Sequence, residues 1–182
     1  MSRTNKFIFL FCLLALAVFG RLLPHIWNAT PILALSLFVS AYFGFEYSIF
    51  FVFAAMFVSD SIIGFYSWQI MLSVYGSLFL AGFLGQYIKR HKNVGSIAVV
   101  TFSSSILFFL VTNFAVWQFG SMYSHTWQGL MDCYTMAIPF FRNSLVGDLF
   151  YTSVFFGVYE LSILSIKNFS PSKNTALSAK NV

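Results

Sequence analysis

The sequence predicts an all-α membrane protein: a bundle of six transmembrane helices, N-in and C-in, with both ends of the chain on the cytoplasmic side. Of the 182 residues, 59% are hydrophobic and 8% are charged, whereas soluble domains carry about 25% charged residues. The apolar residues lie in six segments, and the basic residues gather at the ends that would share one side. This composition excludes a soluble globular domain.

The first apolar segment has two interpretations. Arg3 and Lys6 precede the apolar run 7–19, which is also the pattern of a secretory signal peptide with a cleavage site at 15–17. Alternatively, the run is a retained spanning helix that continues to Leu23. We favour the retained helix because the distribution of basic residues over the whole chain requires a span here.

Five further apolar segments follow, separated by short connections. Their predicted bounds are 32–45, 47–58, 68–87, 94–117 and 139–166. The longest connection, 118–137, is expected to form a re-entrant or short helical loop. We therefore expect a single transmembrane domain over 1–166 and a polar, disordered cytoplasmic tail over 167–182.

The orientation of the bundle follows from its basic residues. With six spans, eight of the ten basic residues fall on one side, namely Arg3, Lys6, Lys89, Arg90, Lys92, Lys167, Lys173 and Lys180. The positive-inside rule makes that side the cytoplasm. The four tryptophans fall on the other side, as an interfacial belt does: Trp27, Trp68, Trp117 and Trp127. We expect a multi-pass protein in the lipid bilayer of the cytoplasmic (inner) membrane of a bacterium.

The second span contains a row of small residues. Ser36, Ser40 and Gly44 recur at four-residue spacing. Small residues so spaced allow two helices to approach closely. They indicate either tight packing within the bundle, which we favour, or a docking face for another subunit.

The last span carries an acidic residue in its middle. Pro139 suits the first turn of a helix, because its missing N–H has no intrahelical partner there. At about 1.5 Å per residue, Asp148 then lies roughly 14 Å from Pro139, near the midplane of a core about 30 Å thick. An ionised carboxylate at that depth requires a partner charge or a wet cavity. We expect Arg21, rather than Arg142, to be that partner, with a ligand cavity as the alternative.

Polar residues accumulate at the non-cytoplasmic ends of the spans. The candidate substrate-binding residues are Arg21, His25, Asn28, Asp60, Asn113, Trp117, Trp127, Tyr134, Arg142, Asn143 and Asp148. The two arginines suit a carboxylate or phosphate of a ligand, and the aromatic residues suit a ring. The alternative is that the arginines and aspartates neutralise one another and only fix the helix register.

Patterns typical of catalysis and metal binding are weak. The serines near the outer face have no identifiable base, and the sequence has no glycine-rich phosphate loop. His25, His125 and Asp132 lack the spacing of a metal site, and Cys12 and Cys133 form no metal or disulfide pattern. The basic residues are too scattered for a nucleic-acid partner. We expect no enzyme, no metal and no cofactor; a membrane protease or acyltransferase is the third choice.

Several polar motifs together resemble a known family. They are Arg21-Leu-Leu-Pro-His25, Asn28-Ala-Thr-Pro31, Asp60 with Gly64, Asn113-Phe-Ala-Val-Trp117, Gly129-Leu-Met-Asp-Cys-Tyr134, Ile138-Pro-Phe-Phe-Arg-Asn143 and Gly147-Asp148. In this combination, which covers residues 15–160, the chain is similar to an uncharacterised family of small bacterial integral membrane proteins. That family resembles the substrate-binding S components of energy-coupling-factor (ECF) vitamin transporters.

The resemblance implies an S-component-like fold with a ligand pocket near the outer face, covered by loops. The expected function is to bind or transport a small, vitamin-like solute, with a transmembrane coupling subunit and ATPases as the implied partners. The first span departs from the Ala-x-x-x-Ala docking face of S components, because Ala15, Ala17 and Gly20 have other spacings. The alternative, from another class, is a non-transporting structural or assembly protein of the cell envelope.

Overall fold

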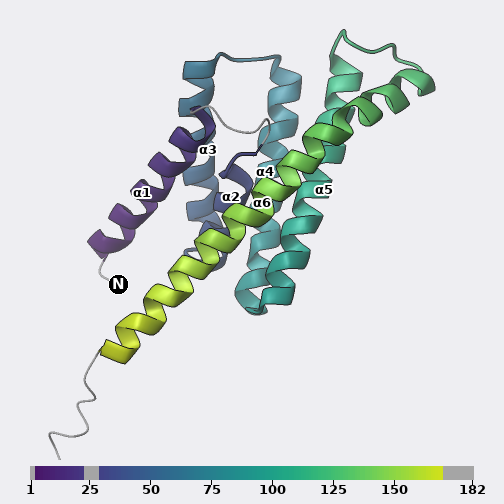
Figure 1. The fold of residues 1–182 in the computed structure, drawn as a ribbon. Coiled ribbons are helices and arrows are strands. Elements are labelled where there is room, and N and C mark those ends of the chain that lie inside the picture. Colours follow the sequence, from purple (N-terminus) through teal and green to yellow (C-terminus); the bar gives the residue numbers. More distant parts are fainter. Residues whose placement is uncertain (1–2, 23–28, 170–182) are drawn as a thin grey trace, which may run out of the picture.

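Six helices build the part of the chain that the computed structural model describes, residues 3–22 and 29–169, and this part contains no strand. The helices are α1 (Arg3–Leu22), α2 (Ile32–Tyr42), α3 (Phe45–Ile63), α4 (Trp68–Arg90), α5 (Val94–Phe119) and α6 (Trp127–Phe169). Helix α2 lies in the middle of the bundle, with α1 and α3 on one side and α4 and α5 on the other (Figure 1). The long α6 crosses the bundle obliquely (Figure 1).

Helix α2 is short but forms the centre of the core. It contacts each of the other five helices, and ten of its 11 residues are buried. At about 1.5 Å per residue, a helix of this length covers roughly half of a bilayer core about 30 Å thick. The space beyond the N-terminus of α2 is therefore filled by other parts of the chain or left as a cavity.

Small polar side chains hold α2 against α4. The Ser36 hydroxyl donates to the carbonyl oxygen of Leu78 at 2.9 Å, and the Ser40 hydroxyl donates to that of Gly82 at 2.5 Å. Ser36 and Ser40 thus pack inside the bundle, as expected from their spacing. Gly44 has a different role: its φ of 113° provides the left-handed turn between α2 and α3, which a residue with a side chain rarely adopts.

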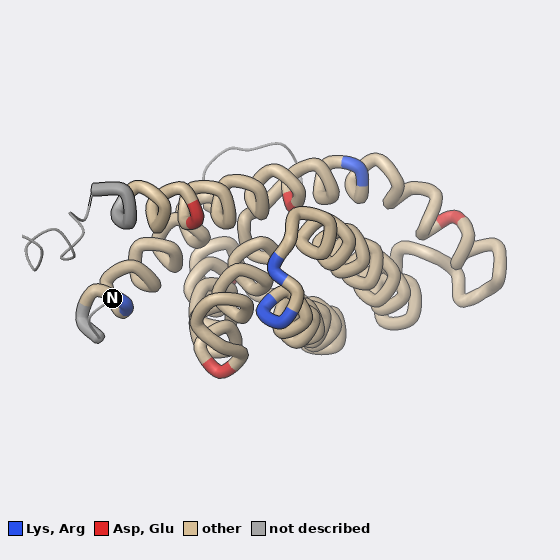
Figure 2. The backbone as a smooth tube through the Cα atoms, turned by 90° about the horizontal axis from the view of Figure 1, so that it is seen from below, with Lys and Arg blue, Asp and Glu red and all other residues tan. Residues whose placement is uncertain are grey.

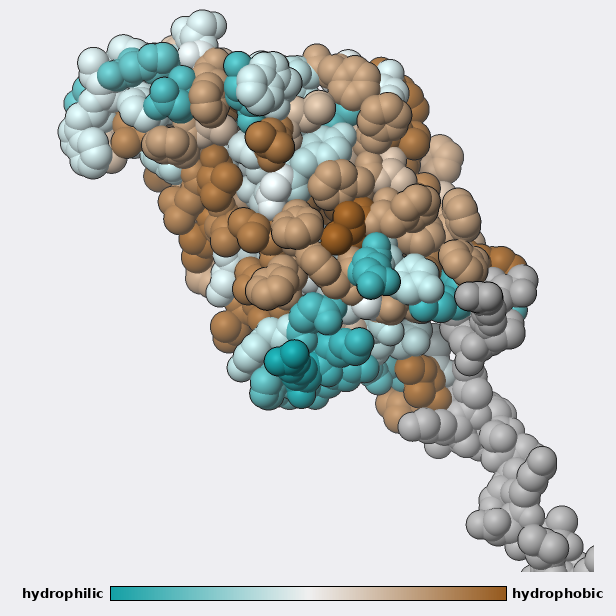
Figure 3. Space-filling model, turned by 180° about the vertical axis from the view of Figure 1, so that it is seen from behind, coloured by the Kyte–Doolittle hydropathy of each residue, from teal (hydrophilic) through white to brown (hydrophobic). Residues whose placement is uncertain are grey.

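Four of the described helices are long and apolar enough to cross a membrane. The apolar stretches are Asn5–Leu22, Phe45–Ile63, Trp68–Arg90 and Val94–Phe119. Many large apolar side chains on them are exposed, such as Phe11, Phe57, Leu72, Phe83 and Val99. On the face shown in Figure 3, hydrophobic surface lies between hydrophilic groups at the two ends. The chain is an all-helical membrane protein.

The two ends of the bundle differ in charge. The first residues of α1, the turn between α4 and α5 and the last residues of α6 lie at one end (Figure 1). Lys89 and Arg90 occupy the last turn of α4 at that end, and the view from below shows the basic residues there (Figure 2). The connections between α3 and α4 and between α5 and α6 lie at the opposite end (Figure 1).

Several predicted bounds are wrong. Helix α6 begins at Trp127, so Pro139 lies inside the helix and not in its first turn. A proline interior to a helix removes one N–H donor, but membrane helices tolerate this loss where neighbouring groups compensate. The predicted loop 118–137 is therefore reduced to residues 120–126.

The other bounds differ by smaller amounts. Helix α2 ends at Tyr42, earlier than predicted, and α3 extends to Ile63, later than predicted. Helix α6 continues to Phe169, three residues into the predicted tail. The rest of that tail, 170–182, lies outside the described residues.

Candidate functional site

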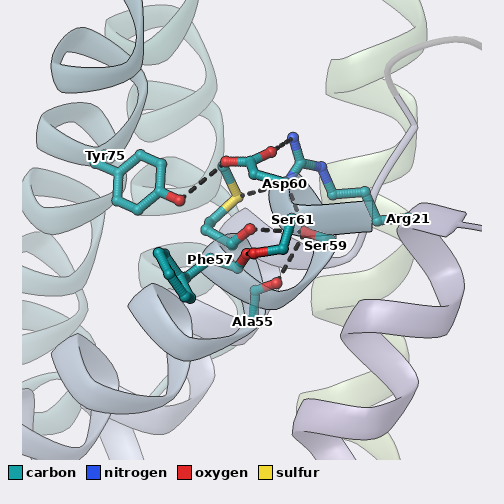
Figure 4. Close-up of polar contacts among 8 residues, drawn as sticks. Arg21, Ala55, Phe57, Ser59, Asp60, Ser61 and Tyr75 are labelled. Carbon is teal, nitrogen blue, oxygen red and sulfur yellow. Dashed lines mark hydrogen bonds and ion pairs between the residues drawn. The ribbon is translucent and has the colours of Figure 1, made fainter. Parts of the chain in front are cut away.

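A buried ion pair joins α1 to α3 near the end opposite the basic turn. Asp60, on α3, has no solvent exposure. Its Oδ1 lies 2.7 Å from Nη2 of Arg21, the penultimate residue of α1. Its Oδ2 accepts a hydrogen bond of 2.9 Å from the hydroxyl of Tyr75 on α4 (Figure 4). Each carboxylate oxygen of Asp60 thus has one partner, and the pair connects three helices.

Arg21 is also held by neighbours of Asp60. Its Nη1 donates to the Ser59 hydroxyl at 2.6 Å and approaches the Met56 sulfur at 3.3 Å. The expected ion pair between Arg21 and Asp148 is therefore wrong, because Asp60 neutralises Arg21. A buried ion pair repays its desolvation only with good geometry, and Asp60 lies directly beside the end of α1.

Asp148 has a different environment. It lies on α6 and is 6% exposed, and Ser105 of α5 donates a hydrogen bond of 2.7 Å to its Oδ2. The one ion pair formed within the described residues is that of Arg21 with Asp60. Within residues 3–22 and 29–169, this buried carboxyl group is thus supported by one neutral hydroxyl and by no cation.

The hydroxyl of Ser105 serves two acceptors with a single proton. It lies 3.0 Å from the carbonyl oxygen of Thr101, one turn earlier on α5, as well as 2.7 Å from Asp148. A hydroxyl group has one O–H to donate, so the two acceptors share it. Asp148 therefore shares its hydrogen-bond donor with a backbone carbonyl, whereas Asp60 has the Tyr75 hydroxyl and the Arg21 guanidinium beside it.

Two adjoining cavities meet at Asp148. The first, of about 230 Å³, is lined by Arg21, Tyr66 and the first residues of α2 among others. The second, of about 240 Å³, lies between α4, α5 and α6 and is lined by Ser105 and Asn113 among others. Four residues line both cavities: Val74, Phe108, Ser144 and Asp148. The carboxyl group of Asp148 therefore lies where the two spaces join.

Tyr66 covers the first cavity from the connection between α3 and α4. Burial first, and then the negative charge of Asp60, raise the pKa of its phenol to about 12 against the opposing effect of Arg21. Tyr66 therefore stays neutral at physiological pH, and its hydroxyl can donate to or accept from a group in the cavity.

The comparisons with known proteins place the chain in a family. A family model described as "Family of unknown function (DUF6580)" matches residues 1–174. The chain belongs to this family. No curated protein and no solved structure matches the chain. The geometry of the site is therefore the basis for any statement about function.

The predicted site residues are distributed over several places. Arg21, Asp60 and Asp148 lie at or beside the first cavity, and Asn113 lines the second. Arg142 and Asn143 line a separate cavity of about 550 Å³ along another face of α6.

The remaining predicted residues lie nearer the surface or outside the described part. The Trp117 indole donates to the carbonyl of Ser124, and the Tyr134 hydroxyl donates to that of Leu110. Trp127 is 74% exposed at the start of α6. His25 and Asn28 belong to the stretch 23–28, which lies outside the described residues.

Some residues of the site were missed by sequence reasoning. Ser105 holds Asp148, Phe108 lines both cavities, and Tyr66 and Tyr75 lie beside the ion pair. The run of three serines at 103–105 in the middle of an apolar segment was a usable signal, because polar residues at that depth are uncommon in spans. No comparable signal marks Phe108 among so many phenylalanines.

The described residues offer little for a metal ion. No group of three or more His, Cys, Asp or Glu side chains is brought together within residues 3–22 and 29–169. The chemical features of the site are therefore a buried carboxyl group, a neutralised guanidinium group, hydroxyl groups and aromatic walls.

Proposed function

We propose that the protein binds a small, vitamin-like solute in the two adjoining cavities and carries it across the membrane, in the manner of an S component. The observation that carries this proposal is the position of Asp148. A carboxyl group that is 6% exposed and supported by one hydroxyl costs free energy at membrane depth, and residues of this kind typically mark functional sites. Its place between two cavities gives it access to a bound molecule.

The sizes of the cavities are compatible with a small ligand when they are used together. Each measures about 230–240 Å³, less than the roughly 300–1,000 Å³ typical of ligand pockets. The side chains of Val74 and Phe108 line both spaces. A rotation of Phe108 would open one space into the other, so that a ligand in contact with Asp148 could occupy both.

The proposal includes a topology of six spans in the cytoplasmic membrane of a bacterium, with both ends of the chain inside. It is supported by the common position of the start of α1 and the end of α6 at the end that carries Lys89 and Arg90. Helix α6, with 43 residues, is long enough to cross obliquely. Reporter fusions near residues 66, 91 and 125 test this topology. A cytoplasmic signal at 125 or an external signal at 91 contradicts it.

A coupling subunit with ATPases is the proposed source of energy. Co-purification of the tagged protein with such a module from its own cells tests this part of the proposal. The spacing of Ala15, Ala17 and Gly20 argues against the usual docking face. If no module co-purifies while binding persists, the protein is a solitary carrier.

Ligand binding is tested by thermal stabilisation of the purified protein with a panel of vitamins and nucleobases. A ligand at 100 times its Kd is expected to stabilise the fold by about 2.7 kcal/mol. Val74→Trp is the matched control, because Val74 lines both cavities and a larger side chain fills them. Stabilisation that persists in this variant would place the binding site elsewhere.

A second candidate is a structural or assembly protein of the envelope without a ligand. It is favoured by the Arg21–Asp60–Tyr75 network, which satisfies its charges internally. This candidate predicts that no compound of the panel stabilises the protein. It also predicts that the Val74→Trp variant, expressed in a deletion strain, restores the wild-type phenotype fully.

A further inference from the structure

We infer that the solute is a small organic cation and that Asp148 is its counter-ion. This inference rests on the proposed function and specifies the chemical class of the ligand. It differs from the expectation that two arginines hold an anionic group of the ligand. In the structure, Arg21 pairs with Asp60 and Arg142 lines a different cavity.

The balance of charges in the cavities is the first argument. Arg21 lines the first cavity, but Asp60 neutralises it at 2.7 Å. Tyr66 is neutral, because its pKa is raised to about 12. Among the described residues that line either cavity, the remaining ionisable one is Asp148. The ionised site thus has an uncompensated negative charge.

The N-terminus of α2 is the opposing consideration. Ile32 and Leu33 line the first cavity, so the positive end of the α2 dipole faces the same space. That end is equivalent to about half an elementary charge, whereas an ionised Asp148 carries a full negative charge. With Asp148 ionised, the net potential is negative, and the backbone N–H groups of the first turn of α2 remain suited to a neutral acceptor on the ligand.

The aromatic walls are the second argument. Phe108 lines both cavities, and the rings of Phe109 and Phe141 on the second cavity have centroids 4.5 Å apart. Aromatic faces attract a cation, and the attraction is stronger where the cation is desolvated. A positively charged nitrogen beside Asp148 would thus have a carboxylate and ring faces within one apolar enclosure. A carboxylate group in the same place would be repelled by an ionised Asp148 and would lack the attraction that ring faces exert on a cation.

The experiment compares three probes of similar shape on purified protein in detergent at neutral pH: benzylamine, benzyl alcohol and benzoate. Benzylamine is expected to raise the melting temperature and to bind roughly tenfold more tightly than benzyl alcohol. A tenfold difference in Kd corresponds to about 1.4 kcal/mol. Sodium chloride at the same concentration is the ionic control. Equal stabilisation by sodium chloride overturns the organic cation, since the site would then accept any cation.

Two variants locate the effect. Asp148→Asn keeps the size of the side chain and removes its charge, so the preference for benzylamine over benzyl alcohol should disappear. Arg142→Gln is the matched control, because Arg142 lines a different cavity; it should leave the preference unchanged. If Asp148→Asn does not fold, Val74→Trp takes its place, and the benzylamine shift should be lost there.

The outcomes separate this inference from the proposed function. Preferential stabilisation by benzoate, or by an anionic vitamin of the panel, overturns the proposal that the solute is a cation. If that stabilisation is lost in Val74→Trp, the result still supports a solute-binding cavity. A preference for benzylamine that survives in Asp148→Asn overturns the role of this carboxylate. No stabilisation by any probe or any panel compound overturns both proposals.

Discussion

Asp60 and Asp148 are both buried between helices of the same bundle, yet their surroundings differ in almost every respect. Asp60 is held by a guanidinium group and a phenol, which approach its two oxygens at 2.7 and 2.9 Å. Asp148 is held by a serine hydroxyl at 2.7 Å that also serves a backbone carbonyl. Asp60 connects α1, α3 and α4, whereas Asp148 lies where two cavities meet.

The difference separates a structural from a functional use of a buried charge. A cation beside a buried carboxylate compensates its lost hydration, so the pair can be stable without any ligand. A buried carboxylate without a cation keeps most of that penalty, and a bound cation or a proton relieves it. Substitutions at the two sites should therefore differ in kind: loss of stability at the first and loss of binding at the second.

The largest effect is expected from Arg21→Gln. It leaves the fully buried Asp60 without its cation, and breaking a buried pair in this way costs about 3–5 kcal/mol. The melting temperature in detergent should fall sharply. Adding Asp60→Asn to the same protein should recover part of the loss, because no unpaired charge remains. Losses that add up in the double variant would show that Arg21 and Asp60 are not coupled as a pair.

A smaller loss is expected from Tyr75→Phe. The substitution removes the 2.9 Å hydrogen bond to Oδ2 of Asp60 but leaves the ion pair. A hydrogen bond to a charged group contributes about 1.5–3 kcal/mol, so the melting temperature should fall less than in Arg21→Gln. Ser73→Ala, two residues earlier on α4, is a control that removes a hydroxyl whose partner is local backbone. A loss in Tyr75→Phe no greater than in this control would contradict the network.

The sequence predicted the helices better than the contacts. The starts of α2, α4 and α5 at Ile32, Trp68 and Val94 agree with the prediction, because connections rich in polar residues, glycine or proline mark them. The predicted start of α6 is wrong, because proline is favourable in the first turn of a helix. Only tertiary contacts decide that the helix continues through Pro139.

The partners of the buried charges could not be predicted in the same way. Arg21 and Asp60 lie on different helices, and no local pattern states which of two aspartates a distant arginine will meet. The depth of Asp148 was a better guide, because helical rise converts sequence distance into membrane depth. This depth identified Asp148 as a candidate. The hydrogen bond from Ser105 and the position of Phe108 between the two cavities depend on the rotation of α5 relative to α6, which no local pattern predicts.

Asp148→Asn should change stability by about 1 kcal/mol or less, since an asparagine carbonyl can still accept the hydrogen bond from Ser105. Removing an unpaired buried charge offsets any loss of that bond. The contrast with Asp60→Asn, which leaves Arg21 without its partner, should be clear in parallel melting curves. A loss at Asp148 as large as that at Asp60 would show that Asp148 also has a structural partner.

The smallest effect concerns Tyr66, which lies beside the ion pair and lines the first cavity. Its pKa is raised from the ordinary value of 10.0 to about 12 by burial and by Asp60, so the folded protein favours the neutral phenol. The corresponding stability is fully present below pH 10 and is lost as the pH rises towards 12, because the unfolded chain ionises first. Tyr66→Phe lacks this group, so its melting temperature should fall less than that of the wild type over the same pH range.

The phenolate absorbance of the folded wild type should likewise show one late-titrating tyrosine that the variant lacks. Parallel alkaline melting curves for the two proteins would mean that Tyr66 titrates as it does in water, and that the first cavity is open to solvent at this position.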